Sequence, residues 1–202
     1  MESQERSSIR GRFVETTFIR YTVHDRANTR PASSEEYDSL ADAVNAYQPD
    51  AELSLMIAQR IIELDVGRDM YGLHRDLLRL LEHIQAGAPS RGPYREAIGS
   101  MAVGVAVYTI VLTEFHDCPI LYISPVDNFI SVQTRTLSGG QVIGSDDDVT
   151  DPVLYDRKAF LQNCTSFLQE YLQDLGSELP LVRDLPEYEA YLRTLRLLAA
   201  GA

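Results

Sequence analysis

The sequence of 202 residues contains two cysteines, one lysine, no tryptophan and no long apolar run. Cys118 and Cys164 lie far apart and form no CxxC pair, so the sequence gives no support to a disulfide framework, a metal site or a redox motif. The stretch between Glu96 and Glu114 carries no charge, but it is shorter than the ~20 apolar residues that a membrane span requires. These absences favour a globular protein that uses no cofactor and no metal.

The first residues, MESQERSSIRGRF, are polar and lack the apolar core of a signal peptide. With only two cysteines, this predicts a reduced, cytoplasmic location. The chain is long enough to bury a core without disulfides or metal ions.

Charge of one sign dominates the chain, whose formal net charge is −12. Such a charge argues against nucleic acid or an anionic membrane as a direct partner, because both would repel it. It is compatible with a basic protein partner, or with an acidic surface that only keeps the protein soluble.

The stretch Met101–Phe115, MAVGVAVYTIVLTEF, is dense in β-branched residues and apolar on both strand faces. It is predicted to be a central strand covered on both sides. An earlier stretch, Arg12–His24, alternates in the same way and is predicted to be another strand.

Between these strands, apolar residues recur at helical spacing. Ser33 followed by Glu36 matches a capping box, and Gly67 is a candidate helix stop. The predicted helices are Ser33–Gln48, Asp50–Val66 and Asp69–Ala86. The apolar stripe of the second helix would consist of Leu53, Met56, Ile57, Ile61 and Leu64.

After the central strand, short strands separated by tight turns predict an antiparallel meander. Two helices follow, over Arg157–Leu175 and Pro186–Ala200. The predicted fold is therefore α+β: a central antiparallel β-meander covered by a long C-terminal helix and preceded by a three-helix segment. We expect one domain over 1–202. The one candidate internal boundary separates a strand plus helical segment, 1–88, from the meander and C-terminal helices, 89–202.

No catalytic motif is present in the sequence: it lacks GxSxG, GxGxxG and the phosphate-binding loop. His116, Asp117 and Cys118 are adjacent, and His24 falls at another strand end. Neighbouring residues seldom face each other as a nucleophile and its base, so turn histidines and a buried cysteine are the simpler interpretation.

Negative charge gathers in the predicted meander, because residues 101–153 contain seven acids and one cation, Arg135. Acidic groups on rigid turns can steer a basic protein towards the surface. The candidate partner-binding residues are Glu114, Asp117, Asp127, Asp146, Asp147, Asp148 and Asp151. The run Asp146–Asp148 lacks the alternating ligands and the glycine of a calcium-binding loop, so no metal site is predicted there.

The run from Cys118 to Leu175 resembles the C-terminal half of the SUKH superfamily, which includes many bacterial toxin-immunity proteins. The resembling segments are CPILYIS, NFISVQTRT, the Gly-Gly turn, PVLY and the helix FLQNCTSFLQEYLQDL, with Asn163, Ser166, Phe167 and Leu168 in that helix. The resemblance implies an inhibitor that covers the basic site of a toxin.

Three functions therefore remain open. The first is a non-enzymatic acidic protein-binding module of the immunity type. The second is a viral or bacterial accessory protein that binds a host partner. The third is an enzyme of unrecognised class that uses His24, His116 and Asp117.

Overall fold

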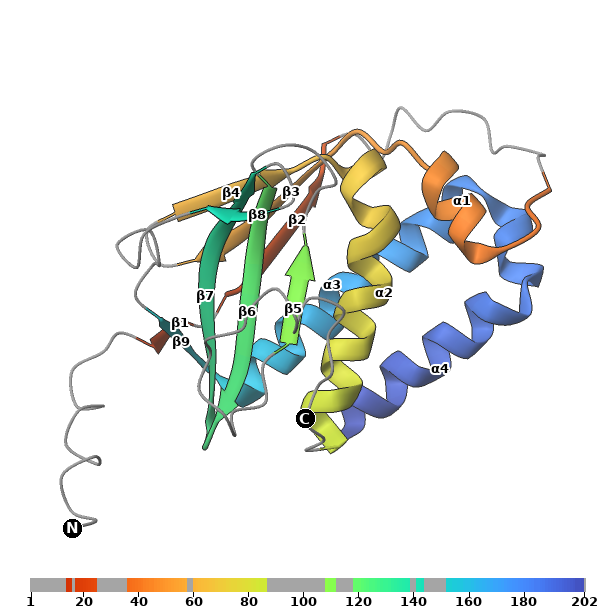
Figure 1. The fold of residues 1–202 in the computed structure, drawn as a ribbon. Helices are drawn as coiled ribbons and strands as arrows, with labels where there is room; N and C mark the ends of the chain where they lie inside the picture. Colours follow the sequence, from red (N-terminus) through yellow and green to blue (C-terminus); the bar gives the residue numbers. More distant parts are fainter. Residues whose placement is uncertain are drawn as a thin grey trace, which may run out of the picture.

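The computed structural model describes residues 14–15, 17–24, 36–57, 60–86, 108–111, 118–138, 141–143 and 152–201 (Figure 1). In chain order the elements are β1 (Val14–Glu15), β2 (Ile19–Val23), α1 (Leu40–Ala46), β3 (Ala51–Ile57), β4 (Arg60–Leu64), α2 (Val66–Ala86), β5 (Tyr108–Val111), β6 (Cys118–Val126), β7 (Phe129–Ser138), β8 (Gln141–Ile143), β9 (Val153–Asp156), α3 (Arg157–Glu178), the 3₁₀-helix η3 (Pro180–Asp184) and α4 (Pro186–Gly201). The predicted α+β class with antiparallel sheets is confirmed.

The larger sheet has the order β1-β9-β7-β6-β5, and β8 also pairs with β7. All its described pairs are antiparallel except β1 with β9. Its longest hairpin, β6–β7, pairs Cys118 with Leu137 at one end and Val126 with Phe129 at the other.

The central position predicted for Met101–Phe115 is wrong within the described residues. Only Tyr108–Val111 of that stretch is described, and this strand, β5, is last in the strand order. The helix α2 packs against β5. The candidate boundary between residues 88 and 89 lies outside the described residues.

The smaller sheet has the order β2-β3-β4 and contains a hairpin where a helix was predicted. Leu53, Leu55 and Ile57 are buried, whereas Ser54 and Met56 between them are not, which is the two-residue period of a strand. The predicted three-helix segment is therefore wrong: α1, the β3–β4 hairpin and α2 replace it.

The first predicted helix is also shorter than expected. α1 begins after Ser39, whose hydroxyl accepts a hydrogen bond from the Asp42 N–H, and not after Ser33. Gly67 lies in the first turn of α2 and does not stop a helix.

The predicted strand Arg12–His24 is divided between the two sheets. Val14 and Glu15 pair with β9, and Ile19–Val23 pairs with β3. At the break, the side chain of Asn163 in α3 replaces a neighbouring strand. Its Oδ1 accepts hydrogen bonds from the Phe18 and Ile19 N–H groups at 2.8 Å, and its Nδ2 donates one to the Ile19 carbonyl at 3.0 Å.

α3 contacts both sheets as well as α2 and α4. Asp156 caps its first turn by accepting from the Ala159 N–H. Phe167 and Leu168 are buried in the core, as the helical spacing predicts. Gly176 does not close this helix, which continues to Glu178. A Cβ at Gly176 would lie 2.6 Å from the Tyr188 Oη, so the glycine permits the close approach of α4.

Candidate functional site

The site predicted on the acidic turns is described at one residue, Asp127. Glu114, Asp117, Asp146, Asp147, Asp148 and Asp151 lie outside the described residues. The Asp127 side chain is exposed at the tip of the β6–β7 hairpin, and its φ of 53° falls in the left-handed region. Asn128 beside it accepts a hydrogen bond from the Arg157 N–H through its carbonyl, at 2.9 Å. This turn holds a carboxylate in solvent on a fixed backbone.

A second group of exposed acids lies in the segment before α1, in α1, in the loop after it and at the start of β3. Between residues 36 and 57 the chain has no lysine and no arginine. Its five acidic side chains are all exposed: Glu36, Asp38, Asp42, Asp50 and Glu52. We call these five residues the α1–β3 acidic surface. Figure 1 shows α1 and β3 joined along the top of the molecule.

Two contacts attach α1 to the rest of the protein. Its N-terminal Leu40 N–H donates to the carboxylate of Glu187 in α4 at 3.3 Å. Leu40, Ala43 and Val44 are buried, and α1 packs against α2. The helix that carries Asp42 of the α1–β3 acidic surface is therefore packed on its other face against the rest of the protein.

The sequence pattern did not predict this acidic surface, because its acids are scattered among apolar residues. A signal was nevertheless available. Residues 31–59 contain six acids and no lysine or arginine, a feature that a charge count over 31–100 averages away.

The residues proposed for an enzyme are not assembled into a site within the described part of the chain. His24 Nε2 lies 3.1 Å from Glu52 Oε1, and both side chains are exposed. His116 and Asp117 lie outside the described residues, and Cys118 is the first residue of β6. Cys164 is fully buried in α3, which raises the pKa of its thiol and makes it a poor nucleophile.

Buried phenols gather where β2, α1 and α3 meet. The Tyr171 ring lies 6.1 Å from the Tyr21 ring and 5.7 Å from the Tyr47 ring, measured between centroids. Burial raises the pKa of both Tyr21 and Tyr171 far above the ordinary value, so these side chains stay protonated. Such groups serve packing better than acid–base chemistry.

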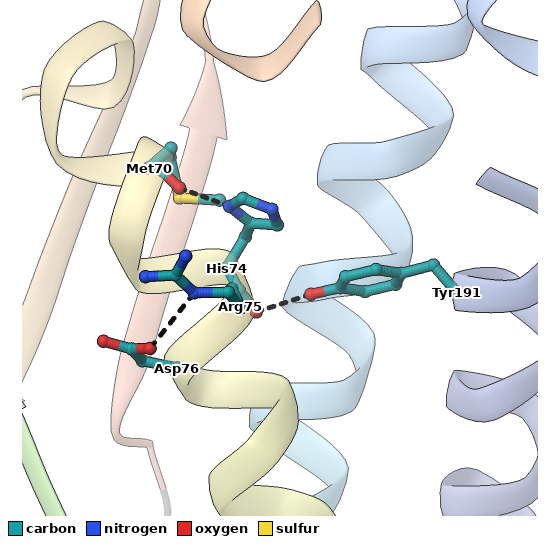
Figure 2. Close-up of polar contacts among 5 residues, drawn as sticks. All are labelled: Met70, His74, Arg75, Asp76 and Tyr191. Atoms are coloured by element: carbon teal, nitrogen blue, oxygen red, sulfur yellow. Dashed lines mark hydrogen bonds and ion pairs between the residues drawn. The ribbon is translucent and has the colours of Figure 1, made fainter. Parts of the chain in front are cut away.

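A buried histidine joins α2 to α4 (Figure 2). His74 Nδ1 lies 2.6 Å from the Met70 carbonyl, which can only accept, so Nδ1 carries the proton. The Tyr191 ring stacks on the imidazole with centroids 5.9 Å apart, and its hydroxyl donates to the His74 carbonyl at 2.5 Å. Burial lowers the pKa of His74, so the ring is neutral near pH 7.

Within the described ranges, no three His, Cys, Asp or Glu side chains are grouped so that they could hold a metal ion. In the same part of the chain, no helix has the length and apolarity to cross a membrane. A scan against protein-family models, a search of curated proteins and a search of solved structures each find no match to this chain.

Proposed function

We propose that this protein is a non-enzymatic acidic module that binds a basic protein partner. The observation that carries the proposal is the α1–β3 acidic surface, with five exposed carboxylates and no lysine or arginine between residues 36 and 57. Clustered charge of one sign draws an oppositely charged partner into encounter and orients it.

The placement of these carboxylates favours a role in binding over a role in solubility alone. Asp42 stands on α1 and Glu52 on β3, two elements whose other faces are buried, so the backbone that carries these two carboxylates is fixed before a partner arrives. A preorganised surface loses less conformational entropy on binding than a floppy one. Asp127, on its fixed hairpin turn, adds a carboxylate of the same kind.

The resemblance of Cys118–Leu175 to immunity proteins supplies a specific form of this proposal. In that form the partner is a toxin with a basic active site, and the acidic surface covers it. The accessory-protein alternative uses the same surface towards a host protein and differs in its biological outcome.

The test begins by identifying the partner through cross-linking in native lysate, and then measures association with the purified partner. We expect E36Q/D38N/D50N to slow association about tenfold at low salt and to flatten its salt dependence, because exposed charges act mainly on the on-rate. None of these three residues caps a helix in the structure.

The matched control is E170Q/E178Q/D184N, which removes the same amount of charge from α3 and η3. An equal effect in the control would show that only net charge matters and would overturn the surface assignment. The variant D146N/D147N/D148N tests the acidic turns of the original prediction in the same assay. If all three variants associate like the wild type across a salt series, the proposed function is wrong.

A growth assay separates the two biological forms of the proposal. If the partner is a toxin, co-expression of this protein restores the growth of cells that produce it, and E36Q/D38N/D50N restores it less well. Binding without any effect on toxicity favours the accessory-protein form.

A further inference from the structure

The two outer edges of the small sheet differ in whether their backbone groups have hydrogen-bond partners. At the β2 edge, the Asn163 side chain makes three hydrogen bonds, with the Phe18 N–H, the Ile19 N–H and the Ile19 carbonyl. At the opposite edge, β3 is the only strand among the described residues that pairs with β4, so the outer side of β4 has no strand partner there. A row of unpaired strand backbone groups is a template for another chain.

The contacts of Asn163 reveal which way each backbone group in this sheet points. In an antiparallel pair, successive residues direct their N–H and C=O groups alternately towards one neighbouring strand and the other. The Ile19 N–H and C=O face Asn163 and so point away from β3. Consistently, the Met56 N–H donates to the Phe18 carbonyl at 2.8 Å, so Met56 points towards β2.

The same alternation carries through β3 to β4. Because Met56 and Ser54 face β2, Leu55 between them faces β4, where it is paired with Ile62. The N–H and C=O groups of Ile62 therefore point towards β3. Its neighbours Ile61 and Glu63 direct their N–H and C=O groups outwards, at the free edge.

The side chains of Ile61 and Glu63 are also on the exposed face of the sheet. Ile61 is 59% exposed, although it is a large apolar residue, and lies opposite Met56 in the register. Glu63 is exposed and lies opposite Ser54. The two residues with outward backbone groups thus present an apolar side chain beside a carboxylate.

We propose that the edge of β4 binds an extended segment of a basic partner, which adds a fourth strand to the small sheet. The segment hydrogen-bonds the backbone of Ile61 and Glu63 and places a lysine or arginine opposite Glu63 and an apolar residue opposite Ile61. A second copy of this chain is a poorer occupant, because each copy carries a net charge of −12. The inference rests on the proposed function, since it names where the basic partner docks.

The probe is a labelled eight-residue peptide of the repeat Lys-Lys-Val-Val, which puts a lysine and a valine two residues apart and so on the same face of a strand. A Glu-Glu-Val-Val peptide is the control of opposite charge. In the free protein we expect the Ile61 and Glu63 amides to exchange with solvent faster than the Ile62 amide. The lysine peptide should slow exchange at Ile61 and Glu63 at least about tenfold at saturation, because each gains a hydrogen-bond partner.

Proline tests the backbone contact directly. I61P removes an outward N–H and spares the ladder to β3, a position at which edge strands accept proline. It should weaken binding of the lysine peptide about tenfold, the equivalent of one lost hydrogen bond, whereas I61A keeps the N–H and weakens binding less. Circular dichroism establishes that each variant is folded.

If I61P fails to fold, E63Q retains the backbone and should flatten the salt dependence of peptide binding. The proposal is overturned if the Ile61 and Glu63 amides are protected in the free protein, if neither peptide binds, or if both bind equally. It is also overturned if sedimentation shows a dimer that I61A dissociates, since a second copy then occupies the edge. The proposed function stands if only these tests fail while E36Q/D38N/D50N still slows association with the native partner.

Discussion

A histidine that already donates its one ring N–H to a backbone carbonyl can take up a second proton only by placing a charge inside the protein. His74 is in this position, with its Nδ1 on the Met70 carbonyl and its ring against Tyr191 (Figure 2). Neighbouring charges oppose each other, because Arg75 disfavours the imidazolium and Asp76 favours it. Burial is the larger influence and keeps the folded ring neutral.

This gives the stability of the protein a definite pH dependence. Since the pKa of His74 is lowered from the ordinary 6.5, the unfolded chain binds the proton more readily than the folded one. The contribution of the neutral His74 ring to the free energy of unfolding is fully present above about pH 6.5. It is lost as the pH falls through the pKa of His74 in the folded protein. Urea unfolding of the wild type and H74Q should therefore show a stability difference that shrinks from about pH 7.5 to about pH 5. A difference that stays constant over that range would contradict the assignment.

At the scale of elements, the β3–β4 hairpin shows where two periodicities coincide. Leu53, Ile57 and Leu64 fit both the predicted helical stripe and the inner face of the hairpin. The two structures differ over Leu55, which only the hairpin buries, and over Ile61, which only the helix would bury. Short apolar runs rich in isoleucine and leucine carry this ambiguity.

Substitutions can distinguish the β3–β4 hairpin from the helix that was predicted for the same residues. In the hairpin, L55A should lower the free energy of unfolding by roughly 2–5 kcal/mol, because it opens a cavity in the core. I61A should change it by about 0.5 kcal/mol or less, because that side chain is exposed. Denaturant titration measures both values. A larger loss for I61A than for L55A would favour the helix.

The longest elements were predictable because their signals are local. α2, α3 and α4 each repeat an apolar stripe over about three or more turns, and the β6–β7 hairpin alternates around a turn that carries Asp127 and Asn128. The division of Arg12–His24 was not predictable, since the break depends on Asn163, which lies 144 residues from Ile19 in the sequence. The residue pattern of Arg12–His24 contains no signal that predicts that contact.

At the scale of the whole molecule, the sequence predicts an acidic protein-binding surface on the meander turns. Among those residues the structure describes Asp127 alone, and its side chain is exposed. The exposed acids between residues 36 and 57 are a further candidate, and they alternate in sequence with apolar residues that α1 and β3 bury.

The excess of negative charge should also be measurable in stability. Raising NaCl from about 10 mM to about 150 mM shortens the Debye length from ~30 Å to ~8 Å and screens repulsion among the acids. We expect the midpoint of thermal unfolding to rise by about 2–4 °C, which corresponds to roughly 1 kcal/mol for a chain of this length. E36Q/D38N/D50N should show a smaller rise in differential scanning calorimetry. A midpoint that falls with salt would contradict self-repulsion.

Residues near the start of the described chain are held by residues far along it, and this bears on how the protein is made. β1 pairs with Leu154 and Tyr155, and the Phe18 and Ile19 N–H groups donate to the side chain of Asn163. Because a ribosome releases the N-terminal part of a chain first, this stretch leaves it well before either partner has been synthesised. An emerging chain therefore carries the segment around Phe18, a side chain that ends fully buried, without the contacts that bury it. Residues 14–19 are therefore synthesised well before they can make the contacts with residues 154–163 that hold them in the fold.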